Sequence, residues 1–98
     1  MNSPLKLLVI EDNPADFLLL EYHLHQHVPD AECRRIGSSA ELDAALQTDW
    51  DAVLSDYNVP GMDFRANLQR LKAHSPDLPV ILVSGTVGEE TAVELLRL

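Results

Sequence analysis

The stretch VLSDYNVPGMD, residues 53–63, decides the fold, because an apolar run ends in it on a carboxylate and a turn follows at once. The run DAVLSD, residues 51–56, has the aliphatic and β-branched content of a buried strand. Asp56 closes this run, and Pro60 with Gly61 shapes the loop behind it. A carboxylate at a strand exit either caps a turn or is presented for chemistry, and the neighbouring segments decide between the two.

Three further segments carry strand patterns. Residues 5–10, LKLLVI, and residues 80–85, VILVSG, are almost continuously apolar, which is typical of strands covered on both faces. Residues 31–36, AECRRI, alternate between polar and apolar side chains, which favours a strand nearer the edge of a sheet. Four strands are therefore predicted, each separated from the next by a helical segment.

The helices are marked by their first residues. Asn13 and Pro14 form a helix start, since Asn caps a helix and Pro fits its first turn. Ser38 and Glu41 have the spacing of a capping box. Helices are predicted over 14–27, 38–47 and 63–74 and from about Glu89 onward, with their core-facing sides formed by Phe17, Leu20, Leu24 and Val28, by Leu42, Ala45 and Leu46, and by Leu68 and Leu71.

The element order is βαβαβαβα. Strands that alternate with helices through short connections predict an α/β fold, with a parallel sheet, helices on both faces and right-handed crossovers. A chain of 98 residues forms one domain.

Composition excludes several function classes. The net charge of −9 argues against direct nucleic-acid binding, because few cations are present to neutralise phosphates. No run of about 18 apolar residues is present to cross a membrane, and the N-terminal residues do not form a signal peptide. The single cysteine, Cys33, is expected to be a half-buried thiol in a strand. We expect a cytoplasmic protein.

Polar residues gather where the predicted strands end. In an open parallel α/β sheet, ligands bind outside the carboxyl ends of the strands at a switch in strand order. Glu11 and Asp12 follow the first strand, Asp56 ends the third, and Ser84 lies at the end of the fourth. If the first and third strands are neighbours, three carboxylates converge and repel one another unless a cation binds. Magnesium, which prefers a few hard oxygen ligands, suits such a site.

This arrangement fits an aspartyl nucleophile that accepts phosphate. Asp56 protrudes centrally, and a metal ion beside it can offset the charge of a phosphoryl group. The hydroxyl of Ser84 and the backbone N–H groups of residues 57–61 can donate hydrogen bonds to phosphoryl oxygens. Taken singly, each residue has an ordinary structural explanation, such as Asp12 near a helix start. Their joint placement favours the functional one.

The segments LLVIEDNPAD, VLSDYNVPGMD and VILVSGTVGEE resemble the response-regulator receiver domain of two-component signalling. The resemblance runs along the whole chain, with separations of 44 residues from Asp12 to Asp56 and 28 from Asp56 to Ser84. It implies a flavodoxin-like, doubly wound parallel sheet with strand order 2-1-3-4, in which strand 5 and helix 5 are absent from this chain.

The resemblance also implies roles for individual residues. Asp56 is the implied phosphoacceptor, and a histidine kinase or a histidine phosphotransfer protein is the implied donor. Glu11, Asp12, Asp56 and the backbone carbonyl of Asn58 would hold Mg²⁺. Ser84 would bond the phosphoryl group and move with it. Asn58 and Thr86, each two residues beyond a site residue, would tune hydrolysis.

The chain departs from the family at its C-terminal end. The family carries a lysine after strand 5 that pairs with the phosphoryl group, and this chain has no counterpart, since Lys6 and Lys72 are its only lysines. We therefore expect a receiver domain over residues 1–98 that is incomplete at the C-terminus, with an output domain to be sought beyond residue 98. Without a fifth strand, the 80–85 strand becomes an exposed apolar edge, and the face formed by this strand and the fourth helix is expected to self-associate.

Two other functions stay open. One is a receiver-like interaction module that is never phosphorylated, and the other is a magnesium phosphatase with an aspartyl nucleophile, which is disfavoured because Asn58 stands where that chemistry needs an acid. A receiver is a self-catalysed switch rather than a classical enzyme, although a kinase or cyclase domain elsewhere in a longer protein stays open.

His23 and His27 lie four residues apart and could bind zinc, but no third ligand is evident and a solvated helix face is favoured.

Overall fold

The computed structural model describes residues 4–84 and 94–97, with side chains described for residues 4–83. Within these described ranges, five strands form one sheet in the order β2-β1-β3-β4-β5. The four strands β2, β1, β3 and β4 are parallel, which confirms the predicted order 2-1-3-4. The elements along the chain are β1 (Lys6–Ile10), α1 (Pro14–His27), β2 (Glu32–Ile36), α2 (Ser39–Ala45), β3 (Ala52–Asp56), α3 (Phe64–His74), β4 (Val80–Ser84) and β5 (Glu94–Arg97).

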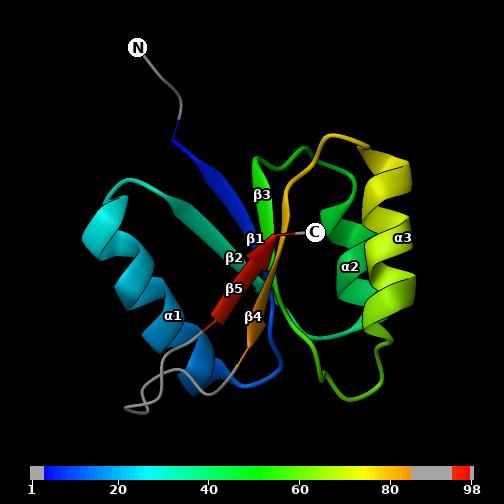
Figure 1. The fold of residues 1–98 in the computed structure, drawn as a ribbon, viewed down its shortest axis with the longest axis horizontal. Coiled ribbons are helices and arrows are strands. Elements are labelled where there is room, and N and C mark those ends of the chain that lie inside the picture. Colours follow the sequence, from blue (N-terminus) through cyan, green and yellow to red (C-terminus); the bar gives the residue numbers. More distant parts are fainter. Residues whose placement is uncertain (1–3, 85–93, 98) are drawn as a thin grey trace.

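Helices cover the two faces of the sheet unequally. Helix α1 lies on one face, and helices α2 and α3 lie on the other (Figure 1). Because successive strand residues point to opposite faces, the strands β1 to β4 contribute to two separate cores. The larger core, beneath α2 and α3, is made of Leu8, Ile10, Ile36, Leu42, Ala45, Val53, Val59, Leu71, Leu78 and Val80. The smaller core, beneath α1, is made of Leu7, Ala31, Leu54 and Val83.

Helix α1 packs only shallowly on its face. Leu20 and Leu24 pack against the smaller core as predicted, yet both are half-buried, and α1 has no fully buried residue. The prediction was wrong for Val28, which is exposed at 36%. Val28 is the residue that ends α1, and the chain has turned away from the helical face there. The inward-facing residues predicted for α2 and α3 do lie in or against the larger core.

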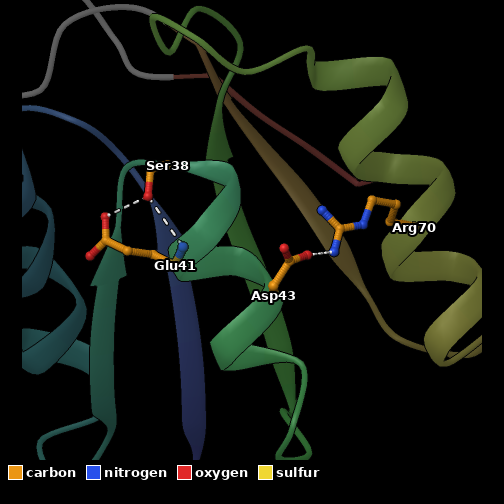
Figure 2. A network of polar contacts seen from close by, with 4 residues as sticks. All are labelled: Ser38, Glu41, Asp43 and Arg70. Atoms are coloured by element: carbon orange, nitrogen blue, oxygen red, sulfur yellow. Dashed lines mark hydrogen bonds and ion pairs between the residues drawn. The ribbon is translucent and has the colours of Figure 1, made fainter.

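The capping box predicted at the start of α2 is present in part, because the Glu41 carboxylate bonds the Gly37 backbone N–H rather than that of Ser38. The Glu41 backbone N–H donates to the Ser38 hydroxyl oxygen at 3.2 Å, and the Glu41 carboxylate accepts from the Ser38 hydroxyl and the Gly37 backbone N–H. On the far side of α2, Asp43 pairs with Arg70 of α3 (Figure 2). Both members of this pair are well exposed, so the capping box is expected to contribute more to stability than the ion pair.

The C-terminal segment differs from the prediction. Residues 94–97 were predicted to lie in a fourth helix, but they form β5, which pairs antiparallel with β4 from Ser84↔Glu94 to Ile81↔Arg97. The edge of the 80–85 strand, which was predicted to be exposed, is therefore covered over residues 81–84. This pairing removes the structural reason for self-association through that edge. A free strand edge offers a row of unpaired backbone groups, and pairing with residues 94–97 satisfies those of β4. The predicted helix start near Glu89 lies outside the described residues.

Candidate functional site

The strand order changes direction between β1 and β3. From β1 the chain crosses over α1 to β2, and from β3 it crosses over α3 to β4 on the opposite face (Figure 1). Neighbouring parallel strands whose connections leave toward opposite faces open a crevice at their carboxyl ends. The register pairs Ile10 with Ser55, so the residues that follow them, Glu11 and Asp56, lie side by side at this edge.

Three carboxylates converge in this crevice. Each of Glu11, Asp12 and Asp56 offers one carboxylate oxygen, and these oxygens lie within 4.8 Å of one another. Glu11 and Asp56 are half-buried, and Asp12 is exposed. The convergence is the one expected from the strand ends, because β1 and β3 are adjacent. We call these three residues the acidic cluster.

Burial and nearby charges change the pKa of Glu11. Burial raises the pKa of the Glu11 carboxyl from 4.5 to about 7, with further contributions from the negative charges of Asp56 and Asp12. A hydrogen bond from the Asn13 backbone N–H, at 3.1 Å from Oε1, opposes this rise. A carboxyl whose pKa is raised by burial and by nearby carboxylates gains from a cation that offsets the negative charge.

Local hydrogen bonds fix the turn that carries Glu11 and Asp12. The Glu11 backbone N–H donates to the Ile36 carbonyl at 2.9 Å, which extends the β1–β2 pairing by one residue. The Asn13 side chain then accepts from the Ala15 and Asp16 backbone N–H groups, which starts α1 directly after the acids. The predicted Asn–Pro helix start is thus confirmed, and it limits the acidic turn to two residues.

Two residues at the end of β2 support this turn and were missed in the sequence. Arg35 is half-buried, and its Nη1 donates to the Glu11 carbonyl oxygen at 3.2 Å. A Cβ on Gly37 would lie 3.2 Å from Asp12 Cα and 3.3 Å from Arg35 Nη1, so glycine permits the close approach of the two loops. Both residues lie at the carboxyl end of β2, the strand beside β1. The sequence points to them only once the strand order is known.

The loop that follows β3, residues 57–63, comes directly after Asp56 of the acidic cluster. Asn58 and Pro60 are exposed, and Gly61 has φ of +80°, the left-handed region that favours glycine. The Met62 backbone N–H donates to the Val59 carbonyl at 3.0 Å and closes the turn. Residues 57–64 line an open hollow of about 430 Å³. Pro60 and Gly61 therefore lie in the tight part of this loop, where the sequence predicts that they shape it.

The remaining predicted site residues lie at or beyond the end of β4. Ser84 is the last residue of β4, one position after Val83, which pairs with Asp56. Thr86 lies outside the described residues. Lys6 is the first residue of β1 and therefore lies at the amino ends of the parallel strands, away from the acidic cluster. Lys72 donates from Nζ to the Leu78 carbonyl at 2.7 Å. Neither lysine stands in for the family's strand-5 lysine.

The donor set of the acidic cluster suits a hard cation. Three carboxylates in contact with solvent supply oxygen ligands and negative charge, and room for water remains on the exposed Asp12 side. Mg²⁺ prefers a few carboxylates and keeps several waters, so these residues fit it better than a metal that seeks nitrogen or sulfur. His23 and His27 are both exposed, in agreement with a solvated helix face. In the described ranges, no helix combines the length and apolarity needed to cross a bilayer.

Comparison with known proteins agrees with this geometry. The family model described as response regulator receiver domain matches residues 7–98. The response regulator protein FleR of Pseudomonas aeruginosa is 34% identical over 98 residues, covering 94% of this chain and 19% of FleR. The glycerol metabolism activator of Pseudomonas putida is 28% identical over 97 residues, covering 93% of this chain and 42% of that protein. The chain therefore spans less than half the length of these relatives.

A solved structure shows the same fold. The crystal structure of the phosphorylated cyanobacterial phytochrome response regulator RcpA matches with a TM-score of 0.70 and 26% sequence identity. The match covers 82% of this chain and 64% of that one. The C4-dicarboxylate transport transcriptional regulatory protein DctD of Pseudomonas aeruginosa is a further relative, 33% identical over 95 residues, which cover 94% of this chain and 20% of DctD.

Proposed function

The chain belongs to the response-regulator receiver domain family of two-component signalling, and on this premise we propose that it accepts a phosphoryl group on Asp56 with the help of Mg²⁺. The convergence of Glu11, Asp12 and Asp56 within 4.8 Å at the β1–β3 switch point is the observation that carries the proposal. The proposed donor is a histidine kinase or a histidine phosphotransfer protein, and the proposed location is the cytoplasm.

The transfer is a displacement at phosphorus. An oxygen of the Asp56 carboxylate attacks the phosphorus of a phosphohistidine, a P–O bond forms and the P–N bond breaks, with its electron pair left on the imidazole nitrogen. That nitrogen takes up a proton from solvent. A bound Mg²⁺ would offset the negative charge shared by the carboxylates and the phosphoryl oxygens.

The protein's own residues orient the acceptor. Asp56 is held by its strand position between β1 and β4, and the Asn13 cap and the Glu11–Ile36 hydrogen bond fix the facing acids. We propose that the Asn58 carbonyl completes the metal ligands and that Ser84 donates to a phosphoryl oxygen. An output domain elsewhere in a longer protein is part of the proposal, because the chain spans 19% of FleR and 42% of the glycerol metabolism activator.

Intact-protein mass spectrometry tests the proposal. The protein is incubated with a small phosphodonor, with Mg²⁺ or with EDTA. We expect a gain of one phosphoryl group that needs Mg²⁺ and is lost in Asp56→Asn. Asp77→Asn, which changes an exposed acid before β4, is the matched control and should behave as wild type.

Two other outcomes would overturn it. Mg²⁺ binding without any mass gain would favour the interaction module that is never phosphorylated. Steady turnover of a phosphate ester would favour the phosphatase.

Asn58 offers a finer test of the same site. It is exposed beside Asp56, so a charged side chain there would meet water or a phosphoryl group entering the crevice. We expect Asn58→Lys to change the lifetime of the acyl phosphate, measured as the decay of the phosphorylated mass after the donor is removed. An unchanged lifetime would show that this position does not tune hydrolysis.

A further inference from the structure

A second group of metal-binding side chains lies between α1 and β2. Glu21 and His25 are four residues apart on α1 and therefore share one face of the helix, and Cys33 lies on β2. Their ligand atoms, a carboxylate oxygen, a ring nitrogen and Sγ, lie within 4.8 Å of one another. All three side chains are half-buried, and none of them belongs to the acidic cluster.

The hydrogen bond of His25 decides which ring nitrogen is free to bind a metal. Nε2 lies 2.9 Å from the Ala31 carbonyl oxygen. A carbonyl can only accept, so Nε2 carries the hydrogen, and in the neutral ring Nδ1 keeps a free lone pair. An imidazole held through one nitrogen by a backbone carbonyl is the usual state of a metal-binding histidine.

We propose that Glu21, His25 and Cys33 bind Zn²⁺ or another borderline-soft divalent ion, with water as the fourth ligand. One carboxylate, one imidazole and one thiolate around a tetrahedral ion match zinc chemistry, whereas the all-oxygen acidic cluster matches magnesium. Zinc bond lengths of about 2.0–2.3 Å imply ligand separations of roughly 3.3–3.7 Å, so the three donors need to close in by at most roughly 1.5 Å. Rotation of the three half-buried side chains would have to supply this movement and bring Nδ1 of His25 toward the ion.

Binding exchanges a proton for the metal. Burial and the nearby Glu21 charge raise the pKa of the Cys33 thiol, so it is protonated in the free protein. The thiol proton passes to solvent as the Zn–S bond forms, and no oxidant or reductant takes part. The bound ion joins α1 to β2, and α1 is the helix that buries no residue of its own. Binding is therefore expected to strengthen the attachment of α1 to the sheet.

Titration of the reduced, metal-free protein with Co²⁺ tests the site. Co²⁺ replaces Zn²⁺ and gives a thiolate-to-metal charge-transfer band, which the acidic cluster cannot produce because it holds no sulfur. We expect the band to saturate at one equivalent and to vanish in Cys33→Ser. His25→Gln, whose amide can still donate to Ala31, should weaken binding at least about tenfold, whereas the exposed neighbour His23→Gln should leave it unchanged.

A stability measurement covers variants that fold poorly. Zn²⁺ should raise the urea midpoint of the wild-type protein and of His23→Gln, and should raise it less in Glu21→Gln. A folded wild type that gives no charge-transfer band would overturn the proposal. So would equal Co²⁺ affinity in His25→Gln and His23→Gln. None of these outcomes depends on Asp56 phosphorylation, so this proposal stands or falls separately from the proposed function.

Discussion

Replacing Asp56 with asparagine is expected to stabilise the metal-free protein. Two unit charges at 4.8 Å, the upper limit of the oxygen separations in the acidic cluster, repel by about 0.9 kcal/mol in water and about 3.5 kcal/mol at an effective dielectric constant of 20. The aqueous value is nearer here, because Asp12 is exposed and the other two acids are only half-buried. Asp56 takes part in two such pairs, so its neutralisation should add about 1–2 kcal/mol to the free energy of unfolding.

Urea denaturation at pH 8 measures this effect. At that pH Glu11, with a pKa of about 7, is mostly ionised, so both pairs contribute. In EDTA the midpoint of Asp56→Asn should exceed that of wild type, with a melting temperature about 4–8 °C higher for each kcal/mol. Saturating Mg²⁺ should raise the wild type more than the variant, because the variant has lost one ligand and one charge.

The control is Asp77→Asn, an exposed acid outside the cluster, which should stay within about 0.5 kcal/mol of wild type. If Asp56→Asn is no more stable than wild type in EDTA, the three carboxylates do not repel one another and the electrostatic reasoning fails.

Three further predictions concern the surroundings of the acidic cluster. Gly37→Ala places a Cβ 3.2 Å from Asp12 Cα, so it should lower the Mg²⁺ affinity measured by calorimetry roughly tenfold. The nearby control Ser39→Ala should leave the affinity unchanged. Equal affinities in the two variants would show that Gly37 does not support the acidic cluster. The pKa of Glu11 is raised from 4.5 to about 7 in the folded state, so between these pH values the folded state binds more protons than the unfolded state. The free energy of unfolding of wild type, measured in EDTA relative to Glu11→Gln, should therefore fall as the pH rises from about 4.5 to about 7. A difference that stays flat or rises would contradict the raised pKa. Ser38→Ala removes the side-chain cap of α2 shown in Figure 2 and should lower the free energy of unfolding in urea by about 1 kcal/mol. Asp43→Asn, which breaks the ion pair with Arg70, should lower it by at most about 0.5 kcal/mol. The opposite ranking would show that the ion pair contributes more than the cap.

Local signals in the sequence were sufficient for most of the fold. Continuous apolar runs, the Asn13 cap and the Ser38–Glu41 spacing depend on neighbours within four residues, and each element that they predict is present. The convergence of Glu11, Asp12 and Asp56 followed from the strand ends once β1 and β3 were taken as neighbours. Their catalytic roles stay predictions.

The features that were missed depend on contacts between distant segments. Residues 94–97 have the local pattern of a helix, and only the open edge of β4 explains their strand pairing. Arg35 and Gly37 support the acidic turn from the neighbouring strand, which the pattern of β2 alone does not show. The sequence drew attention to His23 and His27, whereas His25 is the histidine that faces β2, because the way α1 lies on the sheet decides which of them is covered.

The most direct test of the central claim is to locate the phosphoryl group. The protein is treated with a phosphodonor and Mg²⁺, the acyl phosphate is reduced with borohydride, and the modified residue is identified by tandem mass spectrometry. The proposed function predicts modification at Asp56 alone, dependent on Mg²⁺. Modification at Glu11 or Asp12, or none in a protein that binds Mg²⁺, would contradict it.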